Sequence, residues 1–266
     1  MIETQDTSTP GARRGGPKTD MVGKALHMLT ALGEFPGGAS ASQLARSTGH
    51  PLSTAHRLLQ SLVRDAFAEF DPETRRYRLG LRIFQLGQQT SYAQGFAGSA
   101  QPVIRRVTEA TAEATVVAIL DGARQMTVAK VDGPPPFRVT SDPGSHGALH
   151  STAIGKALVA FAAKDSEALI EELDLVRFTD RTITDRAALR REIERVRELG
   201  YATQDEENED GMRALAVPVR SGSGVAVAAL GVAAPAFRVS MEGLIAHLDL
   251  FRAAADELGS RLPLRA

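Results

Sequence analysis

Residues 41–79 constrain the fold of this chain more than any other stretch, because two short amphipathic helices are followed at once by a hairpin. The stretch reads ASQLARSTGHPLSTAHRLLQSLVRDAFAEFDPETRRYRL. Ser40 or Ser42 is suited to cap the first helix, Gly49 to form the turn, and Pro51 to begin the second helix, which is expected to end near position 65. This order of elements is typical of a winged helix-turn-helix.

The second of these helices has one apolar and one polar face. Its apolar residues recur at helical spacing and predict the buried stripe: Ala55, Leu58, Leu59 and Leu62. Four residues near its start lie off that stripe or border it: Ser53, Thr54, His56 and Arg57. Small hydroxyls and an arginine at the start of a recognition helix reach base edges and phosphates, so we predict that these residues contact DNA.

The hairpin is expected to form the wing. Alternation of Phe70, Tyr77 and Leu79 around the DPET turn favours two short strands. Three arginines in the second strand and the turn before it are predicted to hold phosphates or the minor groove: Arg75, Arg76 and Arg78. The alternative is a small three-helix domain with a charged surface hairpin.

Composition sets the broader limits. The chain has 266 residues, which favours two domains, and no apolar run long enough to span a membrane. It has no cysteine, which excludes disulfides and thiolate metal sites, and no signal-peptide pattern, so we expect a cytoplasmic protein. Residues 1–90 carry 11 Lys+Arg against 8 Asp+Glu, whereas residues 91–266 carry 20 against 24. The positive half is therefore the one expected to meet DNA.

The segments around the motif complete the N-terminal part. Residues 1–20 have no apolar period and are expected to be a disordered tail, so the DNA-binding domain is predicted over 21–80. Its first helix is expected to begin at Met21 and to bury one face: Val22, Ala25, Leu26, Leu29 and Leu32. Residues 81–98 predict a linker helix that either dimerises through Leu81, Phe84 and Tyr92 or simply connects the domains.

The remaining residues, 99–263, alternate helical and strand patterns. TVVAIL and QMTVAKV around a DGAR turn predict one hairpin, and Ala214–Val219 and Val225–Ala233 predict a second. Helical spacing is found over 101–113, 152–163, 166–173, 185–199 and 240–259. Antiparallel hairpins flanked by helices indicate an α+β sensor-like domain, not a parallel doubly wound sheet.

Three blocks together resemble the IclR family of bacterial transcriptional regulators. They are STAHRLLQSL with DPETRRYRLG, LHSTAIGKALVAF, and FTDRTITDRAALRREIERVRELGYATQDEE followed by GMRALAVPVRSGSGVAVAALGVAAP. The resemblance covers nearly all of residues 21–262. It implies a winged helix-turn-helix that binds operator DNA and a GAF-like domain that binds a small effector, often an organic acid. It also implies a homodimer that commonly pairs into a tetramer.

The resemblance also assigns individual residues. In the DNA-binding domain it supports Ser53, Thr54 and Arg57 of the recognition helix and adds Tyr77 beside Arg76 in the wing. For the effector pocket it implies one loop residue, the start of the GK helix, the segment after the GYA strand and the last strand pair: Val139, Ala153, Ile154, Gly155, Gln204, Asp205, Ala214, Gly231 and Ala233.

Four positions depart from the family pattern. Ala214 stands where a cysteine is usual, Gly231 and Ala233 where relatives can have serine, and Ala66 where a glycine usually precedes the wing. The pocket changes predict a roomier and less polar lining, and therefore an effector with an apolar, aromatic or short-chain body. Its carboxylate would meet the backbone N–H groups at the start of the GK helix.

Other patterns do not predict chemistry. The Gly155-Lys156 pair lacks the rest of a phosphate loop, so Lys156 is expected to be a structural or surface lysine. His146 and His150 lack further ligands for zinc, and DEENED at 205–210 reads as a solvated loop. With no catalytic constellation, no cofactor and no metal predicted, we expect a regulator and not an enzyme. The alternatives are an enzyme or a protein-interaction module fused to a winged helix.

Overall fold

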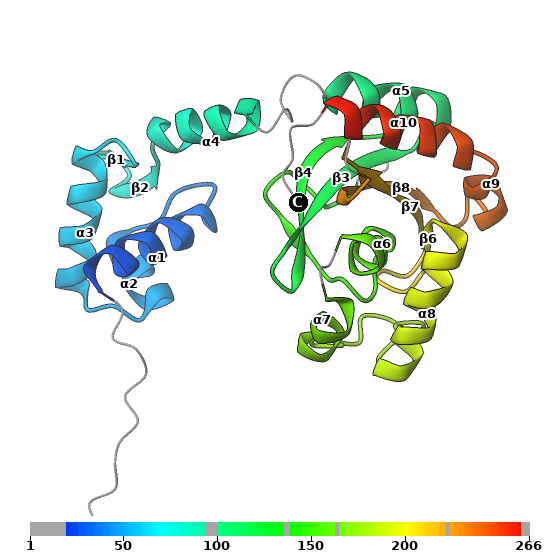
Figure 1. Cartoon of the computed structure of the whole chain (residues 1–266). Coiled ribbons are helices and arrows are strands. Elements are labelled where there is room, and N and C mark those ends of the chain that lie inside the picture. The colour runs from blue at the N-terminus through cyan, green and yellow to red at the C-terminus, as the bar shows by residue number, and fades with distance from the viewer. Residues whose placement is uncertain (1–19, 94–99, 136–138, 163–164, 222–223, 262–266) are drawn as a thin grey trace, which may run out of the picture. The chain divides into compact units, whose positions relative to one another are not determined.

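The computed structural model describes residues 20–93, 100–135, 139–162, 165–221 and 224–261, so positions 1–19 of the tail predicted over 1–20, and the end of the linker, lie outside the described residues. The chain divides into two compact units, one ending at Gly87 and the other beginning at Gln88 (Figure 1). Within the described ranges, no helix is both long and apolar enough to cross a membrane.

The first unit is a three-helix bundle with a two-stranded wing. Ser40 and Gln43 form a capping box at the start of α2, and Gly49 takes a left-handed conformation, with φ of 69°, in the turn before α3. Asp20 caps α1. The elements are α1 (Met21–Gly33), α2 (Ala41–Thr48), α3 (Leu52–Arg64), β1 (Ala68–Asp71) and β2 (Arg76–Leu79). The next helix, α4 (Leu81–Ala93), begins in this unit and continues past its end at Gly87.

The core of this unit confirms the predicted stripe of α3 and part of that of α1. All four predicted α3 residues are buried: Ala55, Leu58, Leu59 and Leu62. In α1, Leu32 is buried and Ala25 and Leu29 pack against the core as predicted. Met28 and Ala31 are buried as well, whereas Val22 and Leu26 are 67% and 60% exposed. Both sets fit a helical period, and only packing against α2 and α3 selects between them.

The wing forms as an antiparallel pair in which Phe70 lies opposite Tyr77. Of the three residues in the predicted alternation only Tyr77 is buried, whereas Phe70 and Leu79 remain 42% and 41% exposed. Tyr77 also exchanges backbone hydrogen bonds with Ala39, at 2.8 and 2.9 Å, which fixes the wing to the bundle. The wing is therefore anchored through one aromatic residue and the backbone on either side of it.

The second unit is built on one antiparallel sheet of order β5-β4-β3-β8-β7-β6. Its central contact joins β3 to β8, two strands far apart in the sequence. The elements are α5 (Gln101–Thr111), β3 (Ala114–Asp121), β4 (Arg124–Val131), β5 (His146–Gly147), α6 (Ala153–Phe161), α7 (Ser166–Glu172), α8 (Arg186–Leu199), β6 (Ala202–Asp205), β7 (Met212–Arg220), β8 (Ala226–Pro235), α9 (Met241–Ile245) and α10 (Leu248–Arg261).

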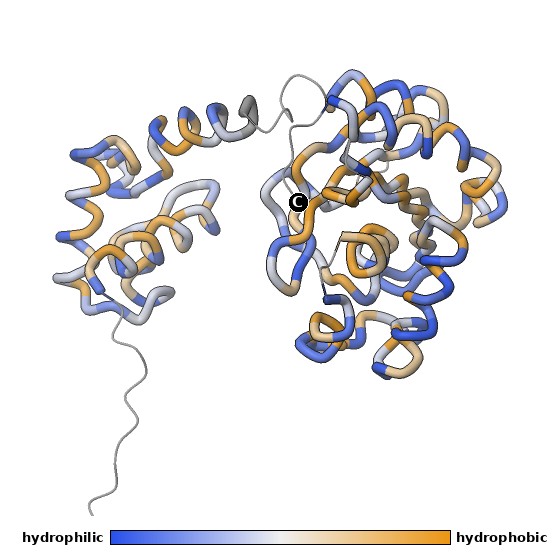
Figure 2. Tube along the Cα trace, in the orientation of Figure 1, coloured by the Kyte–Doolittle hydropathy of each residue, from blue (hydrophilic) through white to orange (hydrophobic). Residues whose placement is uncertain are grey.

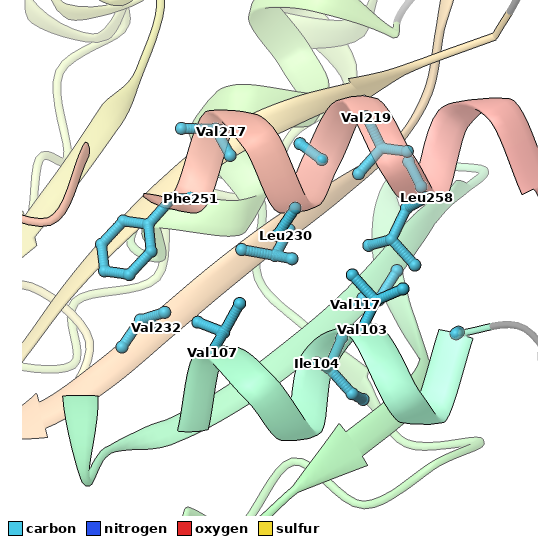
Figure 3. Close-up of a cluster of buried hydrophobic side chains, with 14 of the residues drawn as sticks. Val103, Ile104, Val107, Val117, Val217, Val219, Leu230, Val232, Phe251 and Leu258 are labelled. Atoms are coloured by element: carbon cyan, nitrogen blue, oxygen red, sulfur yellow. The ribbon is translucent and has the colours of Figure 1, made fainter. Parts of the chain in front are cut away.

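Successive residues of a strand point to opposite faces of the sheet, and apolar residues occur in both sets. Both faces are therefore apolar, and helices cover each of them. On one face α5 and α10 pack on β3, β7 and β8, and Figure 3 shows Val103, Phe251 and Leu258 converging on Leu230. On the other face α6 packs on the strands and is itself covered by α8. Figure 2 shows the hydrophobic character of α6, which fits its position between two layers.

The structure confirms the α+β fold and changes some details. The helix predicted over 240–259 is broken into α9 and α10, because the backbone makes a tighter turn at Ala246–His247, where the His247 N–H bonds Leu244. Short edge strands β5 and β6 complete the sheet. Two-residue β5 has too few residues for a period to be read from sequence.

Candidate functional site

The start of α3 presents polar groups on the surface of the first unit. Ser53, His56 and Arg57 are exposed, and Thr54 is half-buried. No side chain caps this helix, whose N-cap is Pro51, so its first-turn N–H groups are not satisfied by a capping side chain. The four predicted residues therefore share the exposed first turns of one helix.

The wing places its arginines and its tyrosine differently. Arg75, Arg76 and Arg78 are exposed, and the Nη1 of Arg76 donates to the Gly38 carbonyl at 2.8 Å. Tyr77 is only 8% exposed, and its ring packs on Phe70 with a centroid separation of 4.8 Å. The tyrosine side chain faces the core, so its position suits support of the wing and not contact with DNA.

The second unit contains a small cavity between the start of α6 and the sheet. Its volume is about 80 Å³. For comparison, an apolar cavity that holds benzene has a volume of about 150 Å³. It is lined by strand residues, the first turn of α6 and two loops: Val116, Gln125, Val139, Thr140, Ser141, Thr152, Ala153, Ile154, Gln204, Asn208, Glu209, Met212, Ala214, Gly231, Val232 and Ala233.

Seven of the nine residues assigned to the pocket by resemblance lie together in this lining: Val139, Ala153, Ile154, Gln204, Ala214, Gly231 and Ala233. Gly155 and Asp205 do not. A Cβ on Gly155 would lie 2.5 Å from backbone atoms of Leu149, so this glycine allows close packing behind the cavity. Asp205 instead accepts from Arg213 at 2.6 Å and from Arg181 at 3.2 Å.

Strand alternation explains why Asp205 does not line the cavity. Gln204 is buried on the α6 side of β6, so its neighbour Asp205 points to the opposite side. Nine lining residues were not predicted, among them Gln125 of β4 and the two loop residues Asn208 and Glu209. Alternation within β4 was a usable signal for Gln125, but nothing in the sequence indicated which loop side chains reach the cavity.

The cavity offers uncharged hydrogen-bonding groups. Gln204 is 6% exposed, its backbone is paired with Ala214 of β7, and its side-chain amide lines the cavity. The Oγ1 of Thr152 caps α6 by accepting from the Gly155 N–H at 3.0 Å, and it lies 3.1 Å from Oε1 of Gln125. Among the described lining residues Glu209 carries the only formal charge, and none is Lys, Arg or His.

A buried lysine holds the loop on one side of the cavity. The Nζ of Lys130 donates to the Val139 carbonyl at 2.5 Å and lies 2.9 Å from a carboxylate oxygen of both Asp132 and Asp142. Burial acts to lower the pKa of Lys130, but the hydrogen bonds to the two aspartates outweigh it and leave the pKa raised. Lys130 is therefore charged where it fixes Val139.

A second buried lysine holds the opposite loop. Lys156, on α6, is 1% exposed and lies 2.7 Å from Oε1 of Glu207 and 3.3 Å from Oε1 of Glu192. Arg195 pairs with Glu192 at 2.9 Å, which completes a network of two positive and two negative side chains. Lys156 is structural, as expected, whereas Glu207 turns inward from the segment that was expected to be a solvated loop.

Burial and pairing act in opposite directions on the two glutamates. Burial raises the pKa of Glu207 and outweighs the lowering by Lys156. Burial also acts to raise the pKa of Glu192, but the hydrogen bonds and charges of Arg195 and Lys156 outweigh it and leave the pKa lowered. Of the two carboxylates paired with Lys156, Glu207 is therefore protonated more readily than Glu192.

A larger cavity lies on the other side of Asn208, with a volume of about 530 Å³. Its walls come from the β3–β4 turn, the segment before α6 and the α7–α8 loop, and Asn208 lines both cavities. His150 and His146, in its wall, each have another partner: Nε2 of His150 lies 2.9 Å from the Val176 carbonyl and Nε2 of His146 lies 2.8 Å from Asp121. Within the described ranges no three metal-binding side chains gather.

A winged helix-turn-helix joined to an α+β domain with an internal cavity defines a ligand-responsive transcriptional regulator. The model of the IclR helix-turn-helix domain matches residues 21–72, and that of the bacterial transcriptional regulator IclR C-terminal matches residues 89–260. The chain belongs to the IclR family, as its sequence motifs predicted.

Individual relatives agree over nearly the whole chain. The HTH-type transcriptional regulator BhcR of Paracoccus denitrificans is 32% identical over 97% of this chain and 94% of its own length. A putative transcriptional regulator from Rhodococcus sp. RHA1 is 31% identical, with a TM-score of 0.78 over 91% of this chain and 97% of its own. An IclR homologue from Microbacterium hydrocarbonoxydans, solved with 4-hydroxybenzoate, is 25% identical, with a TM-score of 0.78 over 88% of this chain and 97% of its own.

Proposed function

We propose that this regulator reads its operator with the first turns of α3. Ser53, Thr54, His56 and Arg57 are accessible there, and the uncapped N–H groups of the helix can receive a phosphate. Arg75, Arg76 and Arg78 of the wing then hold the DNA backbone. The observation that carries this proposal is the gathering of unburied polar side chains on the one helix that follows the Gly49 turn.

We infer that residues 21–80 act as the DNA-binding domain, 81–98 as the linker and 99–263 as a GAF-like effector domain. The linker supports dimerisation, because Leu81 and Phe84 are each 60% exposed on α4. These two exposed apolar side chains lie three residues apart, on one face of the helix, and favour a second copy of the same helix. A dimer presents two recognition helices to two half-sites, and pairing of dimers would give a tetramer. The Tyr92 side chain lies outside the described residues.

The effector is proposed to be a small monocarboxylic acid that carries a further hydrogen-bonding group. The start of α6 favours one negative charge, while the absence of basic residues from the described lining disfavours a second. Gln204 and Asn208 offer amides to a hydroxyl or carbonyl group. The relative solved with 4-hydroxybenzoate supports an acid of this kind, with an aromatic or short-chain body.

We propose that effector binding changes DNA affinity by changing how the two DNA-binding domains of a dimer are presented. The linker helix is the element that connects the two functions, and coupling requires that the effector favour one of two states. The protein would act as a repressor or an activator in the cytoplasm, where its operator is, and through binding and not catalysis.

A gel shift of the purified protein on the DNA upstream of its own coding region tests this function. A discrete band that is competed by the same fragment but not by bulk DNA, and that weakens steeply with salt, is expected for a phosphate-contacting regulator. Addition of 4-hydroxybenzoate or short-chain hydroxy acids should then weaken or strengthen the band. Binding that is insensitive to salt would instead favour a protein-interaction role for the winged helix.

A further inference from the structure

The segment Glu206–Gly211, here called the acidic loop, separates the two cavities of the effector domain. Asn208, at its centre, lines both the 80 Å³ inner cavity and the 530 Å³ outer cavity. Its Oδ1 accepts a hydrogen bond at 2.8 Å from the hydroxyl of Ser151, a residue that is completely buried. One side chain of the acidic loop is therefore part of the wall that the two cavities share.

The acidic loop is held by anchors that do not line the inner cavity. Its deepest anchor is Glu207, whose carboxylate lies 2.7 and 2.8 Å from Nζ of Lys156. Two hydroxyls of the α7–α8 connection hold the backbone: Thr179 donates to the Glu206 carbonyl and Thr182 to the Glu207 carbonyl, each at 2.7 Å. The position of Asn208 therefore depends on contacts made by its neighbours.

The backbone of the acidic loop is strained where it begins. Glu206 has φ of 61°, a left-handed conformation that residues with a Cβ rarely adopt. Its carboxylate accepts from the Gly211 N–H at 2.9 Å, which closes the loop on itself. Strain of this kind persists only where surrounding contacts impose it, so the loop has an unstrained alternative once its anchor is released.

We propose that the acidic loop is a gate between the two cavities, that Asn208 is its moving wall, and that the Lys156–Glu207 ion pair is the latch that keeps it closed. This proposal rests on the effector site proposed above. A gate at this place explains how a cavity too small for an aromatic ring can belong to a protein whose relatives bind one: the acid enters from the outer cavity and occupies the joined space.

Lys156 and Glu207 are positioning residues in this scheme, because neither lines the inner cavity. The network makes the latch reversible. When Glu207 leaves, Lys156 keeps Glu192 as a partner at 3.3 Å, so the buried ammonium is not stranded. Glu207, in contrast, makes its ion pair with Lys156 and becomes hydrated when the loop opens.

Hydrogen–deuterium exchange on the full-length protein tests the gate without any ligand. The amides that report it are Glu206, Gly211 and Met212, which are bonded within or across the acidic loop in the closed form. In Glu207→Ala these amides should exchange about a hundredfold faster, because a buried charge pair has been broken. Glu194→Ala, which removes an exposed acid of α8 paired to Arg197, is the matched control and should leave them unchanged.

A pair of lysine variants separates a latch from a general loss of stability. Lys156→Met should accelerate exchange of the same amides, whereas Lys156→Met with Glu207→Met should return it to near the wild-type rate, because an apolar pair can replace a buried ion pair. If Lys156→Met does not fold, Glu207→Ala alone decides. Wild-type exchange in Glu207→Ala, or acceleration spread equally over α10, would overturn the gate.

Stopped-flow mixing with 4-hydroxybenzoate gives the second readout. Association and dissociation should both be faster in Glu207→Ala, by about tenfold or more, with a smaller change in their ratio. If wild-type protein does not bind 4-hydroxybenzoate, the proposed effector class is wrong, while the exchange result still decides the gate. Unchanged rates for a bound acid would show that entry does not pass Asn208.

Discussion

Ile154 occupies the space that Gly231 leaves open on the sheet. A Cβ on Gly231 would lie 2.5 Å from Cγ1 and 2.8 Å from Cδ1 of Ile154, distances that side-chain carbons do not reach. The extra room expected from a glycine at this position is therefore filled from the facing helix. The inner cavity is small because these two residues are matched to each other.

This pairing predicts the effect of enlarging Gly231. Gly231→Ala should destabilise the effector domain by about 1–3 kcal/mol, because overpacking displaces Ile154. Combined with Ile154→Ala the cost should largely disappear, and a double-mutant cycle from urea unfolding measures this coupling. Additive effects of the two substitutions would contradict the contact. Ala214→Ser, on the same wall, is a control that should not couple to Ile154.

Blocking the inner cavity should separate the two functions. Ala153 is buried at the first turn of α6 and lines the cavity. Ala153→Trp should remove the response to an effector acid while the gel shift of the free protein remains, because the substitution is confined to the effector domain. Full retention of the dose response would place the effector elsewhere. Ala162→Trp, at the end of α6 away from the lining, should retain the response.

The recognition helix offers a direct test of the DNA interface. Arg57 is exposed, and its Nη2 approaches the Met21 sulfur at 3.4 Å. Arg57→Ala should weaken operator binding by about 10- to 100-fold and reduce the salt slope by about one, with no loss of stability. Arg64→Ala, at the far end of α3, is the matched control. Normal operator affinity in Arg57→Ala would exclude the proposed docking.

The turn before the wing should be improvable. Ala66 has φ of 61°, where relatives commonly have glycine. Ala66→Gly should stabilise the winged-helix unit by about 1 kcal/mol, since relief of a left-handed alanine exceeds the entropy that glycine adds to the unfolded chain. Thermal unfolding measures the gain, and Ala45→Gly within α2 should show the opposite sign. A loss of stability in Ala66→Gly would contradict the expected relief of backbone strain at this position.

Acid should loosen the winged-helix unit through His50. Its Nε2 is buried without a partner among the described residues, and its ring lies edge-on to His27 with centroids 5.6 Å apart. Burial first, then the charges of His27 and Lys24, lower the pKa of His50. A base with a lowered native pKa contributes stability above its ordinary pKa of about 6.5 and loses it as the pH falls through the native pKa.

Urea unfolding of the α3 signals in NMR spectra, compared between pH 7.5 and pH 5.5, checks this dependence. The wild-type unit should lose stability at the lower pH, and His50→Gln should lose less. His247→Gln, in the other unit, should behave as wild type. Equal losses in wild type and His50→Gln would assign the acid sensitivity to other groups.

Local patterns predicted the DNA-binding unit well because its signals are local. Ser40, Gly49 and the α3 stripe each depend on residues within one or two turns of a helix. The α1 face was wrong only at Val22 and Leu26, because two overlapping stripes fit its period and only tertiary packing buries Met28 instead of Leu26. Tyr77 was assigned by resemblance, and its burial depends on a bridge to Ala39 that no local pattern contains.

The cavity was predictable only where strands or helix starts supply its wall. Gly231 and Ala233 were assigned by resemblance, and their spacing of two residues on one strand fits a shared face, as the burial of Gln204 fits the alternation of β6. Asp205 failed because the same alternation turns it away. Glu207 and Asn208 belong to a loop, where side-chain directions follow no periodic pattern. Only their contacts in the structure, with Lys156 and Ser151 respectively, show where they point.

The order of strands in the effector domain also determines how the chain can fold during synthesis. The sheet is joined at its centre by β3 and β8, so its middle cannot close until residues up to Pro235 have been made. The DNA-binding unit uses only contacts within the first part of the chain and can be complete long before. A nascent chain would thus carry a finished DNA reader before its sensor exists, and effector control would begin only with the arrival of the last strand.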